Sequence, residues 1–427
     1  MRTVARILRI TALIIAGEMI FALPFHTQRF FRATLLEGFN ITNTQLGDMF
    51  AAYGVVAMIS YFFGGPFADR YSARSLMAVS LVATAAGGLY MATFPGVWSM
   101  TALYGFWGMS STFLFWAALI KATRDWGGHS TQGIAFGILD GGRGFAAAAF
   151  GAMAVSILAI YLPVDTSLIT DADRQAGLRN IVLFYSAITL ACAVIVWFLV
   201  PHDKSAVNAK KNPFSGVGEV VRRPLIWAQA GVIIAAYCGY KGLDNYQLYA
   251  VEVLGMSEVD GARLTTTGAY LRPVAAVIAG VLADRFDATR SIFVSFVLLV
   301  VAFGVLSFAT LEAVSMNIML ANLFVTFFAV YALRGIYYAL LEETRTPRHL
   351  TGASVAIISF IGYTPEIFFG PVTGRILDAD PGIPGHLNYM LFLAVMSAIG
   401  VVVTAVLLKL NKRSAGSNAT GAAAESP

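Results

Sequence analysis

Nine ionisable side chains lie inside apolar stretches of this chain of 427 residues. A charge at membrane depth is costly, so each such group is expected to pair with another group or to contact a solute, an ion or a proton. The nine residues are Glu18, His26, Asp140, Arg143, Lys241, Asp244, Arg272, Arg334 and Glu366. They are dispersed along the chain, which favours a pathway for a small solute over the clustered side chains of a catalytic centre.

Three basic residues in this set are candidates for binding an anionic substrate. Sliding the chain on itself by 215 residues pairs His26 with Lys241, and two basic groups related in this way could hold one anion between them. Arg334 lies among tyrosines and has no acidic residue within one helical turn. Lysine and histidine lack the planar fork with which arginine binds phosphate. A carboxylate or a sugar acid is therefore expected as readily as a phosphate ester.

Asp244 and three aromatic residues are the other candidates for substrate contact. Asp244 follows Lys241 by three residues, so the two side chains either neutralise one another on one helix face or contact the ligand separately. Both interpretations remain open. Tyr237, Tyr240 and Trp116 could line a cavity, although aromatic residues in helical bundles also pack against each other and against lipid.

A further group of residues could couple protons or gate a pathway. Glu18 lies near the middle of its apolar stretch and is the preferred proton carrier, while His26 could carry a proton or be a satisfied structural residue. Asp140 and Arg143 lie in a glycine-rich run that is interpreted chiefly as a tight helix crossing with an internal acid–base pair. Glu366 could gate, couple protons or pair with a distant arginine such as Arg272.

The composition requires a bilayer around the elements that carry these residues. The chain is 58% hydrophobic and 12% charged, with a mean hydropathy of +0.71, which is too apolar for a water-soluble protein. A span needs about 20 apolar residues. Twelve apolar runs meet this need, at residues 7–31, 45–65, 75–94, 97–120, 133–161, 181–200, 225–251, 261–283, 291–311, 316–341, 353–377 and 387–408. We therefore expect an all-α membrane protein with twelve transmembrane helices in two six-helix bundles.

Charge sets the expected boundaries and orientation. Residues 1–200 and 224–410 form the two bundles, 201–223 a charged cytoplasmic linker and 411–427 a disordered cytoplasmic tail. With both termini in the cytoplasm, 19 of the 29 Lys and Arg residues lie on the cytoplasmic side and 6 on the outer side, as the positive-inside rule demands. The net charge of +5 thus follows from topology and implies no nucleic-acid partner.

An internal repeat supports the two bundles. The 215-residue register aligns two G-x-x-x-D-R motifs, each after the second helix of its half, and pairs Thr42 with Ser257 as expected N-caps of that helix. A charged latch is one interpretation of the motifs and a solvated loop is the other. The motif residues are Gly65, Asp69, Arg70 and Arg74 in the first half and Gly280, Asp284, Arg285 and Arg290 in the second.

The doubled motif in a twelve-span plan resembles the signature of the major facilitator superfamily, over the whole chain. The resemblance implies a substrate cavity lined by the first, fourth, seventh and tenth helices. Residues 240–246 are similar to the seventh helix of the organophosphate:phosphate antiporter branch, in which paired arginines hold phosphate. This chain has Lys241 and His26 instead, which leaves the substrate open.

We therefore expect a secondary transporter of a small organic anion, such as a sugar acid, carboxylate or phosphate ester, working by proton symport or anion exchange. A multidrug or metabolite efflux antiporter is the alternative, and an integral-membrane enzyme or a transporter-like sensor is more remote. No Walker A sequence occurs, and histidine and cysteine are too few for a metal centre, so no cofactor is expected. The expected setting is a monomer in the inner (plasma) membrane, with a small-molecule substrate and lipid as its partners.

Overall fold

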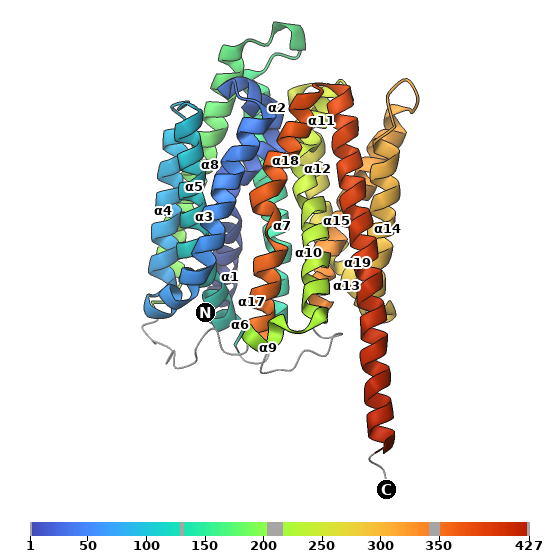
Figure 1. The fold of residues 1–427 in the computed structure, drawn as a ribbon. Coiled ribbons are helices and arrows are strands. Elements are labelled where there is room, and N and C mark those ends of the chain that lie inside the picture. The colour runs from blue at the N-terminus through green and yellow to red at the C-terminus, as the bar shows by residue number, and fades with distance from the viewer. Residues whose placement is uncertain (1, 129–131, 203–216, 341–350, 425–427) are drawn as a thin grey trace. The chain divides into compact units, whose positions relative to one another are not determined.

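The computed structural model describes residues 2–128, 132–202, 217–340 and 351–424. Within these ranges all regular elements are helices (Figure 1), and each of the twelve predicted spans falls on a helical segment, so the predicted all-helical class is confirmed. The elements of the first half are α1 (Arg2–Met19), η1 (Ala22–His26), α2 (Thr27–Phe39), α3 (Asn43–Arg70), α4 (Ala73–Met91), α5 (Val97–Met109), η2 (Ser110–Trp116), α6 (Ala117–Gly127), α7 (Gln132–Tyr161), η3 (Thr166–Leu168) and α8 (Asp171–Leu199).

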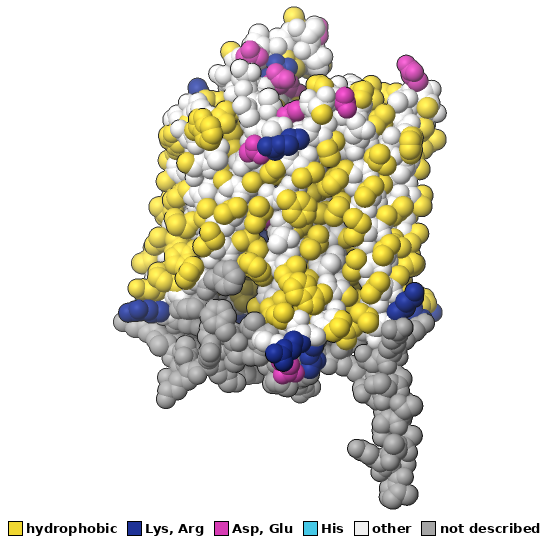
Figure 2. Space-filling view, in the orientation of Figure 1, with side chains coloured by type: hydrophobic (Ala, Val, Ile, Leu, Met, Phe, Trp, Pro, Cys, Tyr) yellow, Lys and Arg dark blue, Asp and Glu magenta, His cyan; other side chains and the backbone are white. Residues whose placement is uncertain are grey.

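The second half follows the same plan. Its elements are α9 (Val217–Val221), α10 (Pro224–Gly242), η4 (Leu243–Asn245), α11 (Tyr246–Glu252), α12 (Glu258–Ala269), α13 (Leu271–Phe286), α14 (Ala288–Leu306), α15 (Met316–Ile336), η5 (Tyr337–Ala339), α17 (Thr351–Gly362), α18 (Pro365–Ala379) and α19 (Ile383–Ala424). Among the described residues, nine helices are long and apolar enough to cross a membrane, or ten if the bent pair α1 and α2 counts as one span. Figure 2 shows hydrophobic side chains over the flanks of the helices in view, while the Lys and Arg side chains in view gather near helix ends.

The predicted N-caps are confirmed. Thr42 begins α3 with a reciprocal capping box, in which its hydroxyl accepts from the backbone N–H of Gln45 and the Gln45 side chain accepts from the Thr42 N–H. Ser257 begins α12, with its hydroxyl accepting from the Asp260 N–H at 3.0 Å. Both caps satisfy donors that a helix start leaves without partners.

The C-terminal helix is longer than the sequence indicates. α19 runs to Ala424 and so covers most of residues 411–427, for which the sequence predicts a disordered tail. Extending a helix that is already formed requires little, because each added residue gains a hydrogen bond without a new nucleus, and this segment is rich in alanine.

Contacts divide the chain into two compact units. Unit 1 comprises Met1–Ala209, Leu243–Pro273 and Glu366–His386. It therefore joins α1 to α8 with two later pieces of chain, one with η4, α11, α12 and the first turn of α13, the other with α18 and the first turn of α19. Unit 2 comprises Lys210–Gly242, Val274–Pro365 and Leu387–Pro427. Two of the cuts fall at interrupted helices, at the start of η4 and after Pro365, which begins α18, and another follows Pro273 in the first turn of α13. Proline is tolerated at a helix start because the N–H that it lacks has no partner within the helix there.

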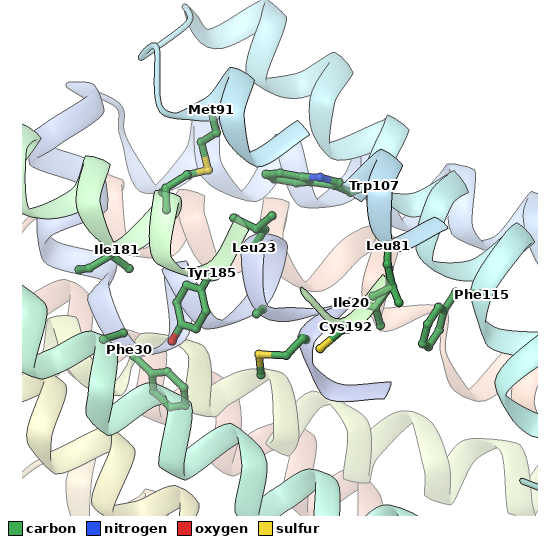
Figure 3. Close-up of a cluster of buried hydrophobic side chains, with 14 of the residues drawn as sticks. Ile20, Leu23, Phe30, Leu81, Met91, Trp107, Phe115, Ile181, Tyr185 and Cys192 are labelled. Carbon is green, nitrogen blue, oxygen red and sulfur yellow. The ribbon is translucent and has the colours of Figure 1, made fainter. Parts of the chain in front are cut away.

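The core of unit 1 is a cluster of large buried side chains (Figure 3). Trp107 of α5 is fully buried, and its indole N–H donates to the carbonyl oxygen of Thr84 in α4 at 3.2 Å. Tyr185 of α8 and Phe30 of α2 lie on another side of the same cluster (Figure 3). Aromatic groups of this size bury much apolar surface, so they fix α2, α4, α5 and α8 as a rigid frame for the polar groups described next.

Candidate functional site

Glu18 of α1 is the centre of a buried polar cluster in unit 1. Its Oε1 lies 3.2 Å from His26 Nε2 and 4.0 Å from Arg272 Nη1, and its Oε2 lies 3.1 Å from Arg143 Nε. All four residues are at most 7% exposed. Arg272 also donates to the Asp140 carboxylate at 2.7 Å. We call these five residues the Glu18 cluster.

A break in the first helix makes this contact possible. Glu18 and His26 are eight residues apart, which in a straight α-helix would separate them by about 12 Å along the axis. The chain instead bends by 46° between α1 and α2, through the π-helical turn η1. Pro24 lies in that turn and cannot donate to the carbonyl of Ile20, so the regular ladder ends there. The bend therefore brings His26 back onto Glu18.

Two aromatic rings hold the guanidinium of Arg143. Its Cζ lies 5.6 Å from the centre of the Phe21 ring and 5.5 Å from that of Trp116, distances at which a cation is attracted to a ring face. Trp116 ends the π-helical turn η2 of the fourth span. Isolated π-turns are frequent at functional sites. Phe21, which precedes η1, and Trp116, which ends η2, thus place both π-turns close to Arg143.

Formal charge balances within the Glu18 cluster when His26 is neutral, because Glu18 and Asp140 oppose Arg143 and Arg272. Two buried polar atoms beside the cluster have no hydrogen-bond partner among the described residues: His26 Nδ1 and the Tyr185 hydroxyl, whose rings lie 5.7 Å apart. Buried polar groups almost always have a partner. These atoms are accordingly candidates for binding water, a proton or a substrate.

A second set of polar contacts joins η4 and α11 to α2 in unit 1. The Asp244 carboxylate accepts from Arg29 Nε at 2.6 Å and from Gln28 Nε2 at 2.8 Å, and Arg29 Nη2 also lies 2.6 Å from it. The Gln247 side chain accepts from the backbone N–H of Ala33 at 2.6 Å. Arg29 and Asp244 are 215 residues apart, so they occupy equivalent positions in the internal repeat. Equivalent residues touch when they lie on the axis that relates two repeats.

Similar contacts join the other later pieces of unit 1 to its first half. Glu258 of α12 accepts from the Thr34 hydroxyl at 2.5 Å and from Arg174 Nε at 2.7 Å. Arg375 of α18 donates to both oxygens of Asp48 at 2.9 and 3.2 Å. We call the polar contacts of η4, α11, α12 and α18 with α2, α3 and α8 the ion-pair seam.

Glycine permits the closest approach in the seam. The backbones of α3 and α18 meet at Gly47 and Gly370, where a Cβ on Gly47 would collide with the carbonyl of Gly370. Beside this contact, the Asp378 carboxylate accepts from the backbone N–H groups of Asn43 and Thr44 at 3.2 and 2.7 Å. Because these N–H groups begin α3, the carboxylate also satisfies donors that the helix start leaves open.

Unit 2 holds a cluster of tyrosines around Arg334. The guanidinium carbon of Arg334 lies 4.0 Å from the centre of the Tyr240 ring. Tyr237 contacts Tyr240 and Tyr363 with ring centres 5.8 and 4.9 Å apart, and Tyr331 lies 6.5 Å from Tyr240. We call these five residues the tyrosine cluster. Its rings offer flat apolar faces with hydroxyl groups, beside one cation.

The structure groups the predicted substrate residues into three places. His26 and Trp116 belong to the surroundings of Glu18 and Arg143, Tyr237 and Tyr240 surround Arg334, and Asp244 lies in the ion-pair seam. Lys241 is buried near the end of α10 in unit 2. The predicted role of each as a substrate ligand stays a prediction, as does the predicted pairing of His26 with Lys241.

The predicted gating residues have identified neighbours. Arg143 contacts Glu18 of α1, and Asp140 contacts Arg272 of α13. The two charged residues of the glycine-rich run in α7 therefore each pair with a residue of another helix. The backbone of Glu366, at the start of α18, lies against Gly54 of α3.

The motif residues are described in part. Gly65 and the side chain of Asp69 are outside the part of the chain whose surroundings the structure describes. Arg74 stacks 4.7 Å from the Trp197 ring centre, and the backbone N–H of Arg290 donates to Asp287 at the start of α14. The remaining motif residues Arg70, Gly280, Asp284 and Arg285 lie at or near the ends of α3 and α13. Their predicted action as a latch stays a prediction.

The seam residues Gln28, Arg29 and Glu258 were missed by reasoning from the sequence, which placed Arg29 among outer-end charges only. The 215-residue register was the available signal, since it pairs Arg29 with Asp244. Among the described residues, no group of three or more His, Cys, Asp or Glu side chains is placed to hold a metal ion.

Comparisons with known proteins agree on one family. The model of the Major Facilitator Superfamily matches residues 13–371. The chain is 26% identical to the inner membrane protein YqcE of Escherichia coli K12, over 87% of each chain. It is 26% identical to the inner membrane protein YihN of the same organism, over 93% of this chain and 94% of that one. The solved structure of the nucleoside transporter NupG matches with a TM-score of 0.71 at 11% identity, covering 94% and 99% of the two chains, which confirms the predicted fold.

Proposed function

The chain belongs to the major facilitator superfamily and is a membrane transporter, not an enzyme, and we propose that its substrate is a small organic anion. The observation that supports this best is the concentration of arginine inside the two units: Arg143 and Arg272 are buried at the Glu18 cluster, and Arg334 is partly buried among tyrosines. Cations held in a low-dielectric interior attract anions far more strongly than cations in water do. A sugar acid, a carboxylate or a phosphate ester would suit them.

The tyrosine cluster favours an anion that carries a ring or several hydroxyl groups. Tyr237, Tyr240, Tyr331 and Tyr363 present ring faces for stacking and phenolic hydroxyls for hydrogen bonds, with Arg334 beside them for the anionic group. A sugar acid has all three matching features. A short carboxylate would use the arginine alone.

Glu18 would couple transport to protons. Its carboxylate already occupies the position of an anion between Arg143, Arg272 and His26. Protonation of Glu18 would release these groups to bind the anion of the substrate, so that proton and substrate bind together. Exchange of one anion for another needs no such step, which makes the two coupling modes distinguishable.

The ion-pair seam would act as a gate. The names of the two Escherichia coli relatives suggest an inner membrane as the location of the protein. In the proposed topology, both termini lie in the cytoplasm. Within unit 1, the seam lies at the end opposite to the N-terminus (Figure 1), which is then the outer side. Opening of the Arg29–Asp244 contact would be one step of alternating access.

A binding screen tests the substrate class. Bound ligand raises the apparent stability of the folded protein. We expect sugar acids to raise the thermal midpoint of the purified protein in a saturable way, and neutral sugars of the same ring size to have no effect. The Arg334→Ala variant should lose the shift, whereas Arg263→Ala, which removes an exposed arginine paired with its helix neighbour Asp260, should keep it. Shifts by lipophilic cations and by no anion would instead favour the efflux antiporter.

A further inference from the structure

A groove in unit 2 lies between α10 and α19, next to the short helix α9. Its volume is about 490 Å³, within the range of about 300–1,000 Å³ that is usual for small-molecule sites. The lining that matters here comprises Arg222, Pro224, Trp227, Ala228, Val403 and Val406. Further along the same two helices, Gly231 lets α10 approach α19, since a Cβ there would lie 3.0 Å from the Val403 side chain. The groove therefore has a closed end at this contact and extends toward the helix ends.

The walls of the groove are apolar and face the lipid side of the helices. Trp227 is 51% exposed and Val406 is 46% exposed. The indole N–H of Trp227 donates to the backbone oxygen of Val221 at 2.8 Å, which satisfies its one polar group and fixes the ring. Half-exposed tryptophan is typical of the level at which hydrocarbon meets head groups. The groove thus offers a fixed apolar surface at the membrane boundary.

Positive charge lies at the same end of the groove. Arg223 is held by Glu219, with Nη2 2.9 Å from Oε1, whereas Arg222 is exposed and makes no ion pair with the residues that the structure describes. Lys409 of α19 is exposed and directly precedes Leu410, which also lines the groove. In Figure 2, basic and acidic side chains gather at α9 directly beside hydrophobic side chains of α10.

We propose that this groove binds one anionic phospholipid, with an acyl chain against Trp227 and Val406 and the head-group phosphate on Arg222 and Lys409. An arginine fork forms charge-assisted hydrogen bonds with phosphate oxygens, and basic pockets between helices at the membrane surface hold anionic head groups. The acyl chain of a zwitterionic lipid would also fill the apolar part of the groove, but its head group has no net charge and would neutralise Arg222 and Lys409 less completely. The lipid would brace the junction of α9 and α10 against α19. This binding site is independent of the proposed substrate.

Lipid titration of the delipidated full-length protein in detergent tests the proposal. Phosphatidylglycerol and phosphatidylcholine with identical acyl chains are added, and the thermal midpoint and the lipid retained in native mass spectrometry are measured. We expect one retained phosphatidylglycerol and a larger midpoint shift than with phosphatidylcholine. One basic residue near an anionic surface contributes about 1 kcal/mol, so Arg222→Ala should weaken phosphatidylglycerol binding about fivefold. Arg263→Ala, which removes an exposed arginine of unit 1, should not.

Three outcomes would overturn the proposal. The two lipids could stabilise the protein equally, Arg263→Ala could weaken binding as much as Arg222→Ala, or soluble glycerol phosphate could reproduce the shift, which would mean that the head group alone binds. Val406→Trp gives a second check that leaves the charges in place. Filling the groove with this side chain should abolish lipid retention, and Arg222→Lys should preserve most of it.

Discussion

At the scale of single residues, Glu18 contacts three basic residues. Its two oxygens contact Arg143, His26 and Arg272, and a buried carboxylate in such a setting stays charged only because the cations remain close. Movement of any one partner changes the free energy of the charged state. A group of this kind can therefore link proton binding to a change of conformation.

Glu18→Gln should uncouple transport from protons. The amide keeps the shape of the side chain but carries no proton-dependent charge. We expect accumulation driven by a pH gradient to fall at least tenfold in proteoliposomes, while exchange of labelled for unlabelled substrate continues at a rate near that of wild type. Accumulation that persists in the variant would rule out Glu18 as the coupling group, and equal loss of both activities would indicate a structural role.

The Arg29–Asp244 pair should behave as a buried ion pair. Removing one partner of such a pair typically costs about 3–5 kcal/mol, because the other charge stays buried without compensation. Arg29→Asp and Asp244→Arg should each lower the thermal midpoint strongly, and the double variant with swapped charges should recover much of the loss. The exposed pair Arg263 and Asp260 is the matched control, for which the same exchanges should cost at most about 1 kcal/mol. Additive losses in the double variant would contradict a direct interaction.

At the scale of elements, the interrupted helices matter most. The first span bends at η1, the fourth widens at η2 and the seventh breaks at η4. Glu18 and His26 of the Glu18 cluster lie beside or in η1, and Asp244 of the seam lies in η4. Backbone N–H and C=O groups that lose their helical hydrogen bonds at a break can bond to a ligand or to a neighbouring helix, and discontinuous helices recur in transporters for this reason. Continuous helices such as α4 and α14 supply the frame.

Gly47 tests the role of close helix contact in the seam. A side chain there would collide with the backbone of α18 at Gly370, so Gly47→Val should push α3 and α18 apart. Overpacking of this kind typically costs about 1–3 kcal/mol. We expect a lower thermal midpoint and easier labelling of a cysteine placed at Thr373 of α18, which is 4% exposed. Gly105→Ala is the control, because a Cβ there meets only the Val56 side chain at 3.6 Å. Unchanged labelling in Gly47→Val would contradict the proposed gate.

At the scale of the whole molecule, the sequence predicted the helical spans and the caps well, because hydropathy and N-cap residues act locally. The contacts of the Glu18 cluster were not predicted, since they depend on a π-helical turn that shows in the sequence only as Pro24. The seam could have been predicted in part from the 215-residue register. The register pairs equivalent residues of the two halves, but it does not indicate which of these pairs are in contact, as Arg29 and Asp244 are.

Uptake by proteoliposomes tests the central claim of organic-anion transport most directly. Purified protein is reconstituted, and uptake of a labelled sugar acid is measured with an acidic exterior and, separately, with unlabelled sugar acid inside. We expect saturable uptake that other organic anions inhibit and that Arg334→Ala lowers at least tenfold. The claim would be contradicted if folded wild-type protein showed no saturable uptake or exchange of any sugar acid, carboxylate or phosphate ester.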